Sequence, residues 1–167
     1  MKPARRQREL RYVDATFLSY ITIPSPSNPF SDANGNIFIH PGDHIPLIPP
    51  HRCKLSFDYG ITDAWSVGAD LVCASSQYFF GDESNQNPPL PGYGAVNFRT
   101  SCEIQQGVVV YGLINNVFDH KYATYATFYE TGIYNVSGNP SAPNLANPDT
   151  ITPAQPFSVY GGLKLRF

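Results

Sequence analysis

Apolar and polar residues alternate along six separate stretches of this chain. In the last stretch Leu163, Leu165 and Phe167 alternate with Lys164 and Arg166. Side chains of a β-strand point to opposite faces in turn, so this pattern predicts a strand with one apolar and one polar face. The same alternation predicts five further strands. The six predicted strands lie near residues 8–21, 51–60, 65–79, 93–104, 108–118 and 157–167.

The connections between these strands are long, short, long, short and long. The long ones are rich in proline, asparagine and glycine, which deny the backbone a regular hydrogen-bond ladder. Short turns at 61–64 and 105–107 predict hairpins. We therefore predict an all-β fold, an antiparallel up-and-down meander whose loops gather at one end and whose turns gather at the other. Strands of roughly 9–11 residues are long enough to cross a bilayer at the tilt of a membrane barrel.

The composition agrees with a chain of strands and limits the function classes. Charged residues make up 14% of the sequence, below the roughly 25% usual for soluble proteins. The 16 prolines and 13 glycines disfavour long helices. A formal net charge of −2 gives no reason to expect nucleic-acid binding. Since no nucleophile elbow, phosphate-binding glycine loop or compact Ser/His/Asp set is present, we do not expect an enzyme or a cofactor.

Three histidines lie close together in the first long loop. His40 and His44 are four residues apart, a spacing that forms a metal-binding pair on a helix, and His51 follows. Pro41 and Gly42 break a helix at this point. We therefore expect a polar loop here and no metal site.

The cysteines are predicted to lie on the apolar face. A turn at 61–64 that pairs Leu55 with Leu71 sets Cys53 beside Cys73, within about 7 Å between Cα atoms. Three cysteines at irregular spacing fit neither a disulfide framework nor a zinc site. We therefore expect Cys53, Cys73 and Cys102 to be free thiols that act as small apolar residues.

Residues 116–122 read Asn-Val-Phe-Asp-His-Lys-Tyr and close a predicted strand shortly before the final loop and strand. This segment resembles the C-terminal region of TonB-dependent outer-membrane receptors. Segments similar to that family also occur at 12–17 (YVDATF), 81–93 (GDESNQNPPLPGY) and 160–167 (YGGLKLRF). The residues that match the family motif are Asn116, Phe118, Asp119 and Tyr122.

The end of the chain also resembles that of outer-membrane barrels. In those proteins a terminal aromatic residue with alternating apolar residues before it is read by the barrel assembly machinery. Phe167, Leu165 and Leu163 stand at the corresponding positions. The resemblance thus implies contact with the barrel assembly machinery, outer-membrane lipid and an outer-membrane location.

The resemblance implies a 22-stranded barrel filled by an N-terminal plug domain. Such receptors take up ferric siderophores, cobalamin, haem or similar ligands, driven by the TonB complex. Residues 1–167 provide only about six strands, and we see no plug, TonB box or export signal in them. We therefore expect a C-terminal fragment that does not transport alone. Its expected partners are the rest of the barrel and plug, with the TonB complex reached only through the missing N-terminal part.

Loop residues are the candidates for ligand contact, although each has a structural alternative. Asp82 and Glu83 stand at the predicted barrel mouth, and the alternative for them is a solvated loop. Tyr125, Tyr129 and Tyr134 lie in the third long loop and could line a vestibule or simply pack the loop.

Charged residues at the polar positions of the strands are expected to face the lumen or plug. These residues are Asp14, Asp58, Asp70, Arg99, Glu103, Lys164 and Arg166. Two other functions stay open for the chain. One is a small self-contained outer-membrane pore or adhesin closed by oligomerisation. The other is a soluble β-sandwich that binds carbohydrate through loop aromatics.

Overall fold

The computed structural model describes residues 4–128 and 148–166. Across these residues the fold is all-β. No helix in them is long and apolar enough to cross a membrane. Six long strands form the main sheet: β1 (Arg5–Tyr12), β4 (His51–Gly60), β5 (Trp65–Ala74), β6 (Tyr93–Gln105), β7 (Val108–Asn115) and β10 (Ser158–Leu165).

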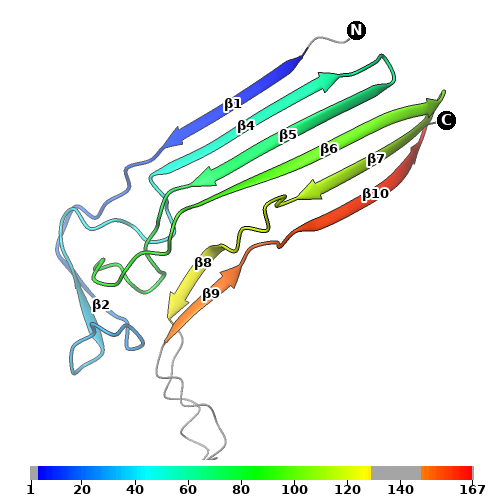
Figure 1. Ribbon diagram of the computed structural model, residues 1–167. Coiled ribbons are helices and arrows are strands. Elements are labelled where there is room, and N and C mark those ends of the chain that lie inside the picture. Colours follow the sequence, from blue (N-terminus) through cyan, green and yellow to red (C-terminus); the bar gives the residue numbers. More distant parts are fainter. Residues whose placement is uncertain (1–3, 129–147, 167) are drawn as a thin grey trace, which may run out of the picture.

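The main sheet is an antiparallel meander in the order β1-β4-β5-β6-β7-β10. The short turns and both ends of the chain lie at one end of the sheet, and the long connections lie at the other (Figure 1). Within the long connections, β2 (Ile21–Pro24) pairs with β3 (Asn36–Ile39), and β8 (Ala123–Phe128) pairs with β9 (Asp149–Pro153). The up-and-down topology expected from the alternating loop lengths is confirmed.

The first strand differs most from its expected position at 8–21. β1 runs from Arg5 to Tyr12 and pairs along its whole length with β4, ending where Tyr12 faces His51. Beyond that point β4 offers no further partner, and the chain turns away into the first long loop. The isolated bridge between Thr16 and His44 lies in this loop. The alternation of apolar and polar residues in the sequence thus continues beyond Tyr12, where the pairing between β1 and β4 ends.

Three other strands end earlier than their patterns predict, while 51–60 coincides with β4. The stretch 65–79 is a strand only to Ala74, and 108–118 only to Asn115, because Asn116 adopts a left-handed backbone with φ 49°. The stretch 157–167 is a strand from Ser158 to Leu165. The fourth predicted strand extends one residue further, to Gln105.

The register between β4 and β5 is the one that the short turn predicts. Leu55 faces Leu71 and Phe57 faces Ala69. Because the pairing continues across β6, β7 and β10, residues on one face form straight rows over the sheet. The row through Phe57 and Ala69 continues through Phe98, Ile114 and Val159.

Within residues 4–128 and 148–166, no second layer packs against the main sheet. Apart from Ala95 in β6, the buried apolar side chains of the described residues lie in the short strands and loops, namely Ile37, Ile39, Phe79, Leu90, Ala123 and Ala126. A β-sandwich needs two sheets packed face to face around such side chains. The β-sandwich alternative is therefore wrong, because the only core in the described chain sits under the loops.

Candidate functional site

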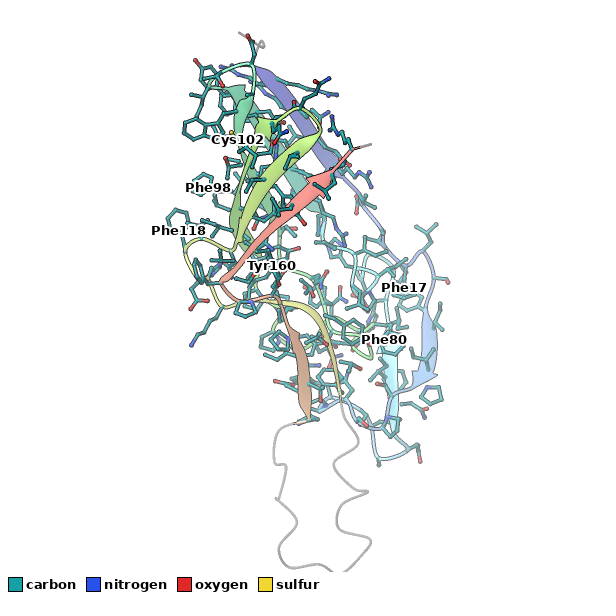
Figure 2. All side chains as sticks on the ribbon, turned by 90° about the vertical axis from the view of Figure 1, so that its right-hand side faces the viewer. Phe17, Phe80, Phe98, Cys102, Phe118 and Tyr160 are labelled. Carbon is teal, nitrogen blue, oxygen red and sulfur yellow. A yellow bond between two sulfur atoms is a disulfide. The ribbon has the colours of Figure 1, made fainter. Side chains whose placement is uncertain are left out.

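One face of the main sheet, here called the apolar face, carries exposed apolar side chains on every strand. Figure 2 shows Phe98, Cys102 and Phe118 projecting from the same side of the sheet. The solvent reaches 45% of Phe98 and 66% of Leu163, so nothing in the described chain covers them. Its large members include Leu10, Tyr12, Leu55, Phe57, Trp65, Leu71, Phe98, Ile104, Val110, Ile114, Val159, Leu163 and Leu165.

The opposite face, here called the polar face, carries the charged strand residues that were expected inside a barrel. It includes Ser56, Asp58, Ser66, Asp70, Asn97, Arg99, Ser101, Glu103, Ser158 and Lys164. Asp14 is an exception because it follows the end of β1 and lies in the loop. Arg166 follows β10, and its backbone N–H donates to the Gly107 carbonyl at 2.8 Å.

Arg99 organises the centre of the polar face. Its Nε and Nη2 donate to Oδ1 of Asp58 at 2.9 and 2.7 Å, and its Nη1 donates to Asp70. The Asp70 carboxylate also accepts a hydrogen bond from Ser56. The cluster links β4, β5 and β6, and it explains how two like-charged carboxylates share one region of the sheet. The alternation in the sequence predicts that these residues lie on one face. Which of them form ion pairs depends on the register between β5 and β6.

Gly68 makes the contact between Asp58 and Arg99 possible. It lies between them in the row of paired residues, and a Cβ atom built on it would lie 2.6 Å from both Arg99 Nε and Asp58 Oδ1. The side chains of β4 and β6 therefore meet directly above the backbone of β5. A glycine in a strand is commonly found where other groups approach the backbone this closely.

We expect Gly68→Ala to destabilise the sheet by about 1–2 kcal/mol, because the Arg99–Asp58 pair must separate and such partly exposed pairs are individually weak. The measurement is the urea midpoint of the chain folded in detergent micelles. Gly94→Ala is the matched control, since a Cβ at Gly94 meets nothing within 4 Å. Equal midpoints for the two variants would contradict the role of Gly68.

The predicted adjacency of Cys53 and Cys73 is confirmed, and the prediction that both are free thiols is wrong. Cys53 faces Cys73 with 5.1 Å between Cα atoms, and the two form a disulfide where free thiols were expected. Paired residues in antiparallel strands place their Cβ atoms within reach of an S–S bond. The odd cysteine count concealed this pair, because Cys102 is the remaining free thiol. Such a disulfide persists in an oxidising compartment, which includes the bacterial cell surface and periplasm.

The loops at the far end of the sheet are joined by a buried carboxylate. Asp82 is fully buried. Its Oδ1 accepts from Asn28 Nδ2 at 3.3 Å, Ser84 Oγ at 3.4 Å and the Gln86 N–H at 3.2 Å. Its Oδ2 accepts from the Asn87 N–H at 3.1 Å. The Asp82 carboxylate therefore holds the loops together, and because it is buried a ligand cannot reach it.

Two asparagines complete the link between the first and second long loops. Asn28 is buried, and its Nδ2 also donates to the Gly81 carbonyl at 2.8 Å. Asn85 has a left-handed backbone (φ 54°), and its side chain accepts from the His44 N–H and donates to the His44 carbonyl. The hydrogen bonds of these asparagines could not be predicted from the sequence, because an asparagine in a polar loop gives no signal of its partner.

Glu83 also turns toward its own loop. Its Oε1 accepts from the Gly81 N–H at 3.3 Å, while Oε2 is buried without a hydrogen-bond partner. Tyr125 in β8 is 38% exposed and is the described tyrosine candidate that stays open to solvent. Tyr129 and Tyr134 lie outside the described residues.

The family motif forms a turn that ties β7 to the start of β10. The Asn116 side chain donates to the carbonyls of His120 and Gln155 at 2.9 and 3.1 Å and accepts from the His120 N–H at 3.0 Å. Asp119, with φ 47°, accepts from the Phe157 N–H at 3.0 Å. Phe118 is 76% exposed on the side of the apolar face (Figure 2). These motif residues therefore fix the crossing of the chain into its last strand.

Tyr122 is the last residue of the motif and packs in an aromatic cluster. Its ring stacks on Tyr93 with 4.3 Å between ring centroids and lies 5.8 Å from the ring of His120. Burial, and secondarily the neighbouring Tyr93, raises the pKa of the Tyr122 hydroxyl. The neutral phenol is thus the form that the fold favours.

The three histidines pack against three different tyrosines. His40 packs against Tyr20, His44 against Tyr78 and His51 against Tyr12. Within the described part of the chain, no group of three or more His, Cys, Asp or Glu side chains is arranged to hold a metal ion.

The last strand, β10, forms one edge of the main sheet. β10 pairs with β7, where Leu163 faces Val110 and Leu165 faces Val108. Its other edge has no partner strand among the described residues. Leu163 and Leu165 lie on the apolar face as the alternation predicts. Phe167 lies outside the described residues.

No protein-family model matches the sequence, and no curated protein matches it. Solved structures of iron-uptake receptors do match. The siderophore receptor PiuA from Acinetobacter baumannii is 20% identical with a TM-score of 0.60, over 81% of this chain and 16% of PiuA. The ferric yersiniabactin uptake receptor FyuA from Yersinia pestis is 17% identical with a TM-score of 0.56, over 79% of this chain and 20% of FyuA.

The ferric-catecholate import receptor Fiu from K12 E. coli matches with a TM-score of 0.55 at 20% identity, over 74% of this chain and 15% of Fiu. At these identities the likeness establishes the fold. The resemblance to TonB-dependent siderophore receptors that the motif at 116–122 predicted is confirmed in fold. The chain spans only a small part of each of these three receptors.

Proposed function

We propose that this chain is the C-terminal portion of a TonB-dependent receptor barrel that takes up a ferric siderophore or a similar ligand across the outer membrane. The six strands of the main sheet would be consecutive strands of a 22-stranded barrel. The remaining strands, the plug and the segment that contacts the TonB complex would lie in the missing N-terminal part.

The observation that carries this proposal is the division of the sheet into two faces. The apolar face is continuous over the strands from β4 to β10 and is not covered by the described chain. Lipid is the environment that suits such a surface, and the polar face with its Arg99 cluster suits a wet interior. Exposed apolar patches of this extent are rare on soluble monomers.

The open edges support the expectation that the chain does not transport alone. Among the strands of the described residues, β1 pairs only with β4 and β10 only with β7. An unpaired backbone group in lipid costs several kcal/mol, so both edges need further strands to close a barrel. Cells that produce this chain alone are therefore expected to show no uptake of a ferric siderophore.

The loop end of the sheet is the proposed ligand side. The Asp82 cluster holds the first two long loops in a fixed arrangement, and Tyr125 in β8 is exposed to solvent. We propose that Tyr125, together with Tyr129 and Tyr134, contributes aromatic contacts to a ligand vestibule. Asp82 would support these loops without touching the ligand.

Two measurements test the proposal. Genomic sequence upstream of the Met1 codon should encode further amphipathic strands and a plug. The purified chain should need detergent to stay monodisperse, and the emission of Trp65, the single tryptophan, should shift to shorter wavelength in micelles because its ring lies on the apolar face, 43% exposed. A folded, monodisperse chain in plain buffer would contradict a membrane role. Stable closed oligomers in detergent would instead favour a self-assembled pore.

A further inference from the structure

β1 departs from the pattern of the apolar face. Because Arg6 faces Phe57 and Arg8 faces Leu55 across the β1–β4 ladder, both arginines lie on that face. The residues between and beside them, Arg5, Gln7, Glu9 and Arg11, lie on the polar face. Two guanidinium groups thus stand at one margin of a surface that is otherwise apolar.

Neither of these two arginines is neutralised by a carboxylate of the described residues. Glu9 pairs with Arg11 at 2.5 Å, and Asp58 pairs with Arg99, both on the polar face. The Arg6 guanidinium lies over the Phe57 ring, with Cζ 5.8 Å from the ring centroid, in a cation–π contact that brings no negative charge. Both arginines are exposed, and where the apolar face meets lipid each guanidinium group is costly unless an anion accompanies it.

An apolar groove of about 580 Å³ continues the row that begins at Arg6. Its lining includes the small residues Ala69 and Gly112 and the larger residues Phe57, Phe98 and Val159. Phe57 lines both this groove and the neighbouring hollow that Arg6 and Arg8 line. A charged end and an apolar groove therefore adjoin on one surface.

We propose that the apolar face binds an anionic glycerophospholipid, with its headgroup phosphate between Arg6 and Arg8 and an acyl chain along the groove over Ala69 and Gly112. Guanidinium groups bind phosphate through two parallel N–H···O hydrogen bonds, which suits a pair of arginines two residues apart. Arg6 lies level with Phe57, three residues before the end of β4 at Gly60, so the headgroup belongs to the leaflet on the side of the short turns.

This inference rests on the proposed function, because it requires the apolar face to meet lipid. A protein strand added at the free edge of β1 could also bring carboxylates to Arg6 and Arg8. The lipid is favoured because the groove beside the arginines has the apolar lining that an acyl chain fills.

The test uses the full chain in detergent micelles and native mass spectrometry with dioleoyl phosphatidylglycerol or dioleoyl phosphatidylcholine. We expect phosphatidylglycerol to bind about fivefold or more tightly than phosphatidylcholine. Arg6→Gln with Arg8→Gln should remove this preference. Arg5→Gln with Arg11→Gln is the matched control, because it removes the same charge from the polar face and should keep the preference.

Equal binding of both lipids to the wild-type chain would overturn the lipid site and leave the membrane proposal standing. Loss of the preference in both double variants would also overturn it, because net charge and not position would then be responsible. A chain that binds neither lipid and is monodisperse without detergent would overturn the proposed function together with this inference.

Discussion

Replacing Asp82 with alanine is expected to release the first long loop from the second. The substitution removes the acceptor of four hydrogen bonds. The N–H groups of Gln86 and Asn87 lose their Asp82 acceptor, and the buried Asn28 amide keeps its hydrogen bond to the Gly81 carbonyl. Losing four hydrogen bonds, two of them from part-buried backbone N–H groups, should cost about 3 kcal/mol in total. Hydrogen exchange of the Gln86 and Asn87 amides should therefore become about 100-fold faster.

Glu83→Gln is the matched control for this experiment. It removes a negative charge one residue away, where Oε2 has no hydrogen-bond partner to lose. Its exchange rates should stay close to those of the wild type. The main sheet should keep its protection in both variants, since Asp82 contacts only loop residues. If Asp82→Ala left the exchange of Gln86 and Asn87 unchanged, the carboxylate would not be the link between the loops.

Asn116→Ala is expected to give the second large effect, a loss of about 3–4 kcal/mol from the stability of the sheet. The variant loses three side-chain hydrogen bonds, each worth about 1 kcal/mol. It also forces alanine into the left-handed conformation at φ 49°, at a further cost of about 1 kcal/mol. The measurement is the urea midpoint of the chain in detergent micelles.

Two further variants separate these causes. Asn116→Gly keeps the left-handed backbone and loses only the hydrogen bonds, so it should be about 1 kcal/mol more stable than Asn116→Ala. Asn34→Ala, at an exposed asparagine in the first long loop, should leave the midpoint unchanged. A wild-type midpoint for Asn116→Gly would show that the hydrogen bonds to His120 and Gln155 contribute little.

The register around the short turn at 61–64 could be predicted from the sequence. A tight turn leaves few ways to align two strands, and alternation then requires Leu55 to face Leu71 if both are on the apolar face. The adjacency of Cys53 and Cys73 follows from the same reasoning. Their oxidation did not follow, since an odd number of cysteines gives no indication of which pair forms a bond.

The end of the first strand could not be predicted in the same way. Alternation of apolar and polar residues continues past Tyr12, yet β1 stops there because β4 begins at His51. A strand is as long as its partner allows, and the partner of β1 lies almost forty residues away in sequence. The pattern therefore predicted a strand in this region but placed it at 8–21.

The burial of the candidate ligand residues in the loops could not be predicted from the sequence either. Asp82, Glu83 and Tyr125 all lie in long polar loops of the sequence, and nothing in the sequence indicates which of them is buried. Contacts with Asn28, more than fifty residues away, decide that Asp82 is buried. Tyr125 stays exposed because β8 presents it outward at the edge of the loop core.

By itself the sequence determined the six strands, their order and the two chemical faces, because alternation and turn spacing are local properties of the chain. The tertiary structure alone decided which side chains meet across strands and loops. The Arg99 cluster above Gly68, the bond between Cys53 and Cys73, and the position of Arg6 and Arg8 beside an apolar groove all depend on register with distant partners. Register describes which residues of two paired strands face each other, so the sequence of a single strand does not determine it.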